Sequence, residues 1–283
     1  MKIGVSAYSF KKYMDHTRCN YIDICNIAKE IGYDGIEFVD LDPEISGKPV
    51  IETAEEIRSH CASIGLEVIC YAVGANFLAD DIAAEIERVK GCVDVAAALG
   101  APTMRHDACW KPRTAPRYTW QDAVAEMAPH IREVTEYAAA KGVRTCTENH
   151  GQFLQQPERV EALIRTVDHP NYGWLIDIGN FICADCDSIQ SVAAAIPYAF
   201  HVHAKDFLYK KGSEPNPGEG WFMTRGQNHI RGTIVGHGVI PVAQCIAMLK
   251  SAGYDHWISL EFEGLEDNMT ALKAGHAYLR RFA

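Results

Sequence analysis

The sequence predicts a (β/α)8 TIM barrel that occupies residues 1–283 as one domain. Short runs rich in β-branched and aromatic residues alternate with segments of helical period along the whole chain. Eight such units are expected, the number that closes a barrel, and glycine follows several helical segments, where helix ends favour it. A doubly wound open sheet is the alternative architecture.

The first half of the chain sets this alternation. β-branched and aromatic runs predict strands at residues 2–8, 35–39, 66–73 and 101–106. Apolar residues at helical spacing predict helices at residues 21–31, 53–64 and 81–99. The joints IGYDG, SIGLE and LGAP place a glycine just past each helix, so each unit runs from strand to helix to glycine turn.

The second half continues the pattern with one interruption. Strands are predicted at residues 143–148, 172–180, 199–206 and 257–263, and helices at 121–140, 157–167, 188–196, 242–251 and the C-terminal end. The glycine- and proline-rich stretch Leu208–Gly238 breaks the alternation and is expected to be irregular. Its aromatic and basic residues indicate a lid or pocket wall, with a contact inside a homo-oligomer as the alternative.

Composition limits the classes of function. The chain is 48% hydrophobic and 23% charged, which is typical of a globular fold, and its net charge of −10 disfavours nucleic acid as a partner. No apolar run approaches the length that crosses a bilayer, so we expect a cytoplasmic protein with no membrane partner. Small neutral substrates suit this balance of charge.

Cysteine is frequent but scattered. Ten cysteines are spread along the sequence, and we expect reduced, buried thiols. Cys183 and Cys186 form a lone CxxC motif, whereas a structural zinc site would need a second such pair. The motif alone therefore predicts no metal or redox site.

Alternation along the last strand identifies inward-facing acids. In WISLEFE, Ile258, Leu260 and Phe262 share one parity and are expected to face the helices. Glu261 and Glu263 have the other parity and are expected to face the barrel axis. Active sites of such barrels lie where the strands end, so both acids are candidates for the site.

Three preceding strands repeat this arrangement. In AFHVHAKD, Phe200 and Val202 are expected to face outward, and the inward residues are His201, His203 and Lys205. Asp177 has the inward parity of its strand, and Glu148 and His150 share a parity at the end of theirs. Four consecutive strands therefore deliver Glu148, Asp177, His203 and Glu261 toward one mouth.

Three carboxylates and one imidazole at one mouth predict a divalent cation, because unpaired like charges repel strongly there. Oxygen ligands with a single nitrogen favour Mn²⁺, with Mg²⁺, Co²⁺ and Zn²⁺ as alternatives. The competing interpretation is a set of separate buried polar residues satisfied by hydrogen bonds, or by Lys205 and Arg105. The convergence of all four on one end favours the metal.

The segments ENHG, DIGNF, HVHAKD and SLEFEG resemble the metal-bearing strand ends of the xylose isomerase-like TIM-barrel superfamily. The resemblance covers essentially the whole chain and points to the branch with ketose 3-epimerases, hydroxypyruvate isomerase and inosose dehydratase. It implies that Glu148, Asp177, His203 and Glu261 bind one divalent ion. It also implies that Glu148 and Glu261 exchange protons with a sugar or keto-sugar through an enediolate. Glu263 is the alternative to Glu261.

Departures from that superfamily bear on the substrate. Ketose 3-epimerases and the DNA-repair endonucleases of this fold carry a histidine where this chain has Asn180, and the histidines that a three-zinc endonuclease needs are missing. DNA cleavage is therefore disfavoured. A non-catalytic sugar-binding barrel would predict a damaged ligand set, but this set is intact. Elimination from a keto-sugar, inosose or 3-keto-glycoside stays open beside isomerisation and epimerisation, because all begin with the same proton removal.

Polar residues at strand ends and in the long loop are candidate substrate contacts. These residues are Tyr8, His106, His150, Asn180, Lys205, Arg231 and His237. For Lys205 the alternative is a salt bridge to Asp206 or Glu261, and for His106 it is an ordinary surface or core histidine.

Overall fold

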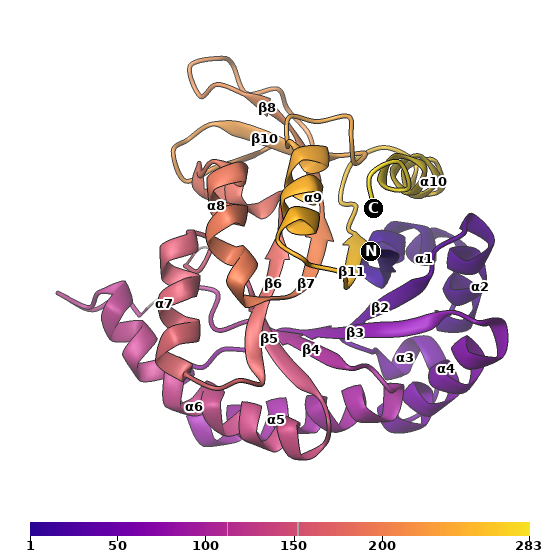
Figure 1. Cartoon of the computed structure of the whole chain (residues 1–283), viewed down its shortest axis with the longest axis horizontal. Coiled ribbons are helices and arrows are strands. Elements are labelled where there is room, and N and C mark those ends of the chain that lie inside the picture. Colours follow the sequence, from indigo (N-terminus) through magenta and orange to yellow (C-terminus); the bar gives the residue numbers. More distant parts are fainter. Residues whose placement is uncertain (112, 152) are drawn as a thin grey trace.

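A computed structural model describes residues 1–111, 113–151 and 153–283 of the chain. Its parallel strands close into a barrel in the order β1-β11-β7-β6-β5-β4-β3-β2, which confirms the predicted fold (Figure 1). The barrel strands are β1 (Lys2–Ser6), β2 (Gly35–Val39), β3 (Glu67–Val73), β4 (Thr103–His106), β5 (Arg144–Glu148), β6 (Tyr172–Asp177), β7 (Ala199–Ala204) and β11 (Trp257–Leu260).

Helices follow the barrel strands close to the predicted positions. The longer helices are α2 (Tyr21–Ile31), α4 (Val50–Ile64), α5 (Ile82–Leu99), α6 (Trp120–Ala140), α7 (Pro157–Val167), α8 (Ser188–Ala195), α9 (Val242–Ser251) and α10 (Asn268–Leu279). Shorter helical segments that were not predicted are η1 (Ala7–Phe10), α1 (Lys11–Thr17), α3 (Pro43–Ser46), η2 (Asn180–Ala184) and η3 (Ile196–Tyr198).

Local capping explains where the helices begin and end. The Asn20 side chain accepts from the backbone N–H groups of Ile22 and Asp23, and the Asp23 carboxylate accepts from Asn20 N, so a capping box opens α2. Gly32 ends this helix at φ 105°, a left-handed conformation that glycine adopts without steric cost. This is the glycine signal on which the predicted turn rested.

The core has two parts. A large cluster includes Ile258, Leu260 and Phe262 together with apolar faces of the helices, as the predicted parity requires. A smaller cluster joins Ile69, Cys70, Cys146 and Leu175, with Phe200 and Trp257 packed against it. These residues come from strands that are not all neighbours, so this cluster lies inside the barrel.

The outward prediction for Phe200 is wrong. Its ring packs against the inner cluster, and a Cβ on Gly173 would lie 2.6 Å from that ring. The pairing of β6 with β7 shifts register between Trp174 and Leu175, which displaces the start of β7 from simple alternation. Val202, beyond the shift, joins the large cluster as expected.

The stretch Leu208–Gly238 is not irregular throughout. It contributes to a small antiparallel sheet formed by β8 (Asp206–Lys210), β9 (Phe222–Met223) and β10 (His229–Thr233). Figure 1 shows β8 and β10 projecting beyond the β7 end of the barrel. Asp206 fixes the base of this sheet, because its carboxylate accepts from the backbone N–H groups of Phe207, Gly236, Gly238 and Ile240.

Two further sequence expectations have structural outcomes. The cysteines, including Cys183 and Cys186, are free thiols. In the part of the chain that the structure describes, none of the helices combines the length and the apolar character needed to cross a membrane.

Candidate functional site

The four predicted ligands come together at the mouth of the barrel. One ligand atom from each of Glu148, Asp177, His203 and Glu261 lies within 4.8 Å of the others. Glu148 and Asp177 end β5 and β6, His203 lies near the end of β7, and Glu261 directly follows β11. The alternation of parallel strands thus places three oxygen donors and one nitrogen donor at one point.

Three of these ligand atoms have room for a further interaction. Asp177 Oδ2, His203 Nδ1 and Glu261 Oε2 are buried and make no well-formed hydrogen bond to the described residues. Lys205 Nζ lies 3.3 Å from Asp177 Oδ2 and 2.6 Å from Glu261 Oε2, so it balances part of their charge. His203 Nδ1 lies 3.5 Å from Glu261 Oε2, so three buried ligand atoms face one another with Lys205 as their cationic neighbour. Oxygen and nitrogen atoms converging in this way also fit a divalent cation.

The backbone and the neighbouring strand hold Asp177 in place. Its Oδ1 accepts from Gly179 N at 2.8 Å and from Asn180 N at 2.9 Å. Asn149 Oδ1 accepts from Asp177 N at 3.0 Å, and Asn149 Nδ2 donates to Asp177 O at 2.8 Å. With Oδ1 occupied, Oδ2 is the oxygen left for a ligand.

Glu37 on β2 is a site residue that sequence reasoning missed. Its side chain is fully buried, and Oε2 lies 2.9 Å from His203 Nε2 and 3.2 Å from His201 Nε2. Burial raises the pKa of Glu37, but the charges and hydrogen bonds of His203 and His201 outweigh this effect and hold it below its usual range. His203 thus has Nε2 tied to a carboxylate and Nδ1 directed at the cluster, the arrangement typical of a metal-binding histidine.

A signal for Glu37 was present in the sequence. The run GIEFV has the same alternation as the last strand, with Ile36 and Phe38 on one face and Glu37 on the other. An acid within such an apolar strand needs a polar partner. With Ile36 and Phe38 facing the helices, Glu37 is expected to face the barrel axis, where other polar side chains meet.

Glu148 is fixed by donors on both oxygens. Arg105 Nη2 lies 2.7 Å from Glu148 Oε2, and Asn180 Nδ2 donates to Glu148 Oε1 at 2.9 Å. Arg105 also pairs with Asp107 at 2.8 Å, and Asp107 accepts from His150 Nδ1 at 2.9 Å. Arg105 is therefore a partner of these acids, as the competing interpretation named it, and Asp107 is a site residue that was not predicted. Asn180 and His150 lie at the site, as expected.

Lys205 lies among the acids of the site. Burial lowers the pKa of Lys205, but Asp177, Glu261 and Glu263 outweigh it and raise the pKa above the usual value. Burial raises the pKa of Asp177 to about 7, opposed by Lys205. Burial also raises the pKa of Glu261, but the charges of Lys205 and His203 outweigh burial and lower the pKa below its usual value. Lys205 is thus both the predicted salt-bridge partner and a lining residue of the cleft.

Three predicted substrate contacts lie elsewhere. His106 is fully buried and stacks on Tyr172, and burial lowers its pKa to about 4. On β4 it is Arg105, not His106, that faces the barrel axis and lines the inner cavity. Arg231 on β10 pairs with Glu266 at 3.1 Å. His237 follows β10, and none of the three lines the two cavities at the site. A role of His106, Arg231 or His237 in substrate binding therefore stays a prediction that these two cavities do not support.

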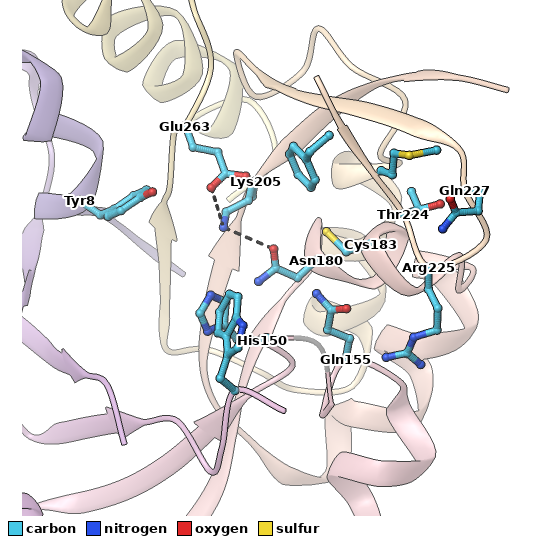
Figure 2. A pocket seen from close by; sticks show the side chains of 14 residues that line it. Tyr8, His150, Gln155, Asn180, Cys183, Lys205, Thr224, Arg225, Gln227 and Glu263 are labelled. Atoms are coloured by element: carbon cyan, nitrogen blue, oxygen red, sulfur yellow. Dashed lines mark hydrogen bonds and ion pairs between the residues drawn. The ribbon is translucent and has the colours of Figure 1, made fainter. Parts of the chain in front are cut away.

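Two adjoining cavities open at this end of the barrel. The inner cavity, about 320 Å³, is lined by Glu37, Arg105, Asp107, Glu148, His203 and Glu261 among others. The outer cavity, about 680 Å³, reaches the antiparallel sheet, and the residues that border both are Tyr8, His150, Lys205 and Glu263. Figure 2 shows Tyr8, Lys205 and Glu263 on one side of the outer cavity and Thr224 and Gln227 on the other.

Glu263, the alternative ligand, is not in the four-residue cluster. Its carboxylate lies 3.6 Å from Lys205 Nζ and is partly exposed. The position two residues beyond Glu261 places it between the two cavities rather than at the donor cluster.

Comparison with solved structures shows the same fold. The chain is similar to the probable 3-DHS dehydratase AsbF from Bacillus anthracis, at 23% identity over 99% of each chain with a TM-score of 0.76. It is also similar to the IolI protein with a bound zinc atom, at 17% identity over 100% of this chain and 98% of that one with a TM-score of 0.78. A third similar structure is D-allulose 3-epimerase from Methylomonas sp., at 17% identity, the same coverage and a TM-score of 0.75.

Sequence comparison identifies the family. An uncharacterized protein of Methanocaldococcus jannaschii, MJ1311, is 24% identical over 173 residues, which are 56% of this chain and about half (52%) of that relative's length. The family model described as xylose isomerase-like TIM barrel matches residues 25–282. The chain therefore belongs to the xylose isomerase-like TIM barrel family.

Proposed function

We propose that this protein is a divalent-metal-dependent sugar isomerase or epimerase that removes a proton next to a carbonyl group. The observation that carries the proposal is the convergence of ligand atoms from Glu148, Asp177, His203 and Glu261 within 4.8 Å of one another. These four residues would hold the ion, with Mn²⁺ preferred and Mg²⁺, Co²⁺ or Zn²⁺ as alternatives. The substrate would be a small sugar or keto-sugar.

The bound ion would supply Lewis-acid polarisation of the substrate carbonyl. Glu148 and Glu261 come from β5 and from the end of β11, with β6 and β7 between them, so they approach the inner cavity from different directions. One carboxylate takes the proton from the carbon next to the carbonyl, and the electron pair moves onto the carbonyl oxygen to give an enediolate. The other group, which enters the cycle as a carboxylic acid, gives its proton to the same carbon from the opposite face in epimerisation. In isomerisation a proton is added to the former carbonyl carbon, and the proton of the neighbouring hydroxyl group moves to the former carbonyl oxygen.

Neighbouring groups prepare the two carboxylates for these roles. Arg105 and Asn180 donate to the two oxygens of Glu148 and fix its orientation. Lys205 lies 2.6 Å from Glu261 Oε2 and keeps this group ionised, as a base requires. Substrate hydroxyls would meet Tyr8, His150, Asn180 and Lys205, which line the cavities. Positioned acid–base groups of this kind contribute roughly 10²–10⁴-fold to a rate.

Elimination of water from a keto-sugar, inosose or 3-keto-glycoside is the second candidate, and His150 favours it. Burial lowers the pKa of His150, but its hydrogen bond to Asp107 outweighs burial and raises the pKa above the usual value. A histidine at the cavity wall with a raised pKa keeps its proton to a higher pH than a free imidazole, and the protonated form can donate to a leaving hydroxyl group. The similarity to a structure named as a probable dehydratase supports this candidate through the fold alone.

Deuterium exchange tests both candidates. The Mn²⁺-loaded protein is incubated in D₂O with ketoses, inososes and 3-keto-glycosides, and nuclear magnetic resonance and mass spectrometry follow deuterium uptake and products. Metal-dependent deuterium uptake with an isomer or epimer as product supports the proposal, whereas an unsaturated product supports elimination. Absence of exchange with every compound would contradict both and would favour a sugar-binding barrel. Cleavage of abasic DNA would favour the endonuclease alternative.

A further inference from the structure

The outer cavity is larger than the cleft that contains the proposed metal ligands. At about 680 Å³ it has about twice the volume of the inner cavity, about 320 Å³, and it continues from the inner one past His150, Lys205 and Glu263. Ligand pockets span roughly 300–1,000 Å³, so the inner cavity alone suits a compact molecule such as a single sugar. The two together provide room for a longer substrate.

The far wall of the outer cavity is tied to the barrel. Asp185 accepts from Thr224 Oγ1 at 2.7 Å and from Asn228 Nδ2 at 2.8 Å, and also from Gly226 N. Arg225 N donates to Cys183 O at 2.9 Å. Because η2, which ends just before Asp185, starts three residues after Asp177, the wall is held at a fixed position relative to the site. It is a preformed wall rather than a detached lid.

Exposed apolar side chains border the outer cavity from two directions. Trp110, from the connection between β4 and α6, is 53% exposed, and Phe222 and Met223, on β9, are 44% and 48% exposed. Trp110 lies over Gly151, where a Cβ would come within 3.3 Å of its ring, and makes an edge contact with His150. Large apolar side chains that stay exposed around a concave surface mark a ligand site.

The remaining lining is polar, with Lys205 and Glu263 on the inner side and Arg225 on the far wall as its charged members. Gln155, Thr224 and Gln227 line the outer cavity beside these apolar side chains, whereas the acids gather at the inner cavity. A sugar ring has apolar faces and hydroxyl groups at its edges, so it matches aromatic and thioether surfaces combined with amide and hydroxyl groups.

From these observations we infer that the substrate has two rings, a keto-sugar in the inner cavity and a second, glycosidically linked sugar ring in the outer cavity. The inference rests on the proposed function, because it assigns the reacting ring to the metal cluster. It adds the class of substrate, a disaccharide-sized keto-sugar, and names Trp110 and Phe222 as residues that select it.

Matched pairs of ligands test this inference. Isothermal titration calorimetry of the Mn²⁺-loaded protein compares D-fructose with lactulose, and methyl 3-keto-β-D-glucoside with 3-keto-cellobiose. The readout is the ratio of the two dissociation constants within a pair. We expect the two-ring compound of at least one pair to bind about tenfold more tightly, which corresponds to about 1.4 kcal/mol.

Variants of the outer cavity identify the source of this ratio. Trp110→Ala and Phe222→Ala remove exposed side chains from different elements, and each should lower the ratio at least about threefold with an unchanged circular dichroism spectrum. Ile51→Ala, an equally exposed apolar residue on α4, is the matched control and should leave the ratio unchanged. A ratio near one in both pairs, or a ratio that neither cavity variant lowers, overturns the inference.

The same compounds separate this inference from the proposed function. Metal-dependent deuterium uptake into the single-ring compounds with a ratio near one would overturn only the two-ring substrate. Absence of deuterium uptake in all four compounds, together with absence of binding, would overturn the proposed function and this inference with it.

Discussion

Replacement of Glu37 by glutamine should weaken metal binding without unfolding the barrel. Glu37 Oε2 is the partner of both His203 Nε2 and His201 Nε2, at 2.9 and 3.2 Å, and Glu37 is not one of the four candidate ligands. Glutamine keeps the size and one acceptor oxygen but removes the negative charge. His203 would then hold its proton on Nε2 less firmly and would present a weaker donor at Nδ1.

The magnitude follows from the change in hydrogen-bond type. A hydrogen bond to a charged group is worth about 1.5–3 kcal/mol and a neutral one about 0.5–1.5 kcal/mol. The midpoints of these ranges differ by about 1.2 kcal/mol, which corresponds to a loss of affinity approaching tenfold, near the lower end of the roughly 10–100-fold losses seen when partners of metal ligands are changed. We therefore expect the dissociation constant for Mn²⁺ to rise about tenfold in Glu37→Gln.

Isothermal titration calorimetry with Mn²⁺ measures this change, and circular dichroism monitors the fold. The matched control is Asp40→Asn, because Asp40 lines the same inner cavity and makes no hydrogen bond or ion pair with the four candidate ligands in the described residues. Equal affinity in wild type and Glu37→Gln would refute the positioning role. An equal loss in Asp40→Asn would assign the effect to the general charge of the cavity instead.

Four further substitutions test the proton transfer, the metal site and the stability of the fold. Glu148→Gln and Glu261→Gln should each lower turnover by on the order of 10²-fold or more, with metal content measured on the same samples, because each removes a proton-transfer group. His203→Ala should lose most bound metal while its circular dichroism spectrum is unchanged, since the residue lies above the packed interior of the barrel. Asp206→Ala should lower the free energy of unfolding in urea by roughly 2–5 kcal/mol, because four backbone N–H groups lose a buried acceptor.

Opposite results would be equally clear. Near-normal turnover of both glutamine variants with metal bound would refute the two-carboxylate mechanism and make Lys205, His150 or His201 the leading base. Global unfolding of His203→Ala would show that this residue supports the fold rather than the metal. An unchanged unfolding curve for Asp206→Ala would mean that water replaces the carboxylate at no cost.

The features that the sequence predicted well depend on short-range periodicity. Strand alternation reflects the pleat of the backbone, so the inward positions of Glu148, Asp177, His203 and Glu261 follow from two-residue spacing once the strands are located. Glu37 obeys the same rule in GIEFV and was within reach of it. The barrel itself follows from repetition of these units.

The features that were missed depend on contacts between distant residues. Arg231 pairs with Glu266, and His106 stacks on Tyr172, and no local pattern encodes either partner. In the antiparallel sheet, the two-residue edge strand β9 pairs with the central strand β10 among turn-forming residues. This long-range pairing outweighs a weak local preference for strand. The position of Phe200 depends on a register shift between β6 and β7, and two-residue alternation within one strand does not predict such a shift.

The metal content of the purified chain tests the central claim most directly. The protein is loaded with Mn²⁺, dialysed against metal-free buffer and analysed for metal and protein in the same sample. The cluster of Glu148, Asp177, His203 and Glu261 predicts about one ion per chain, and little or none in Asp177→Ala. A wild-type chain that retains no metal, or that retains about three ions, would contradict the mononuclear site on which the proposed chemistry depends.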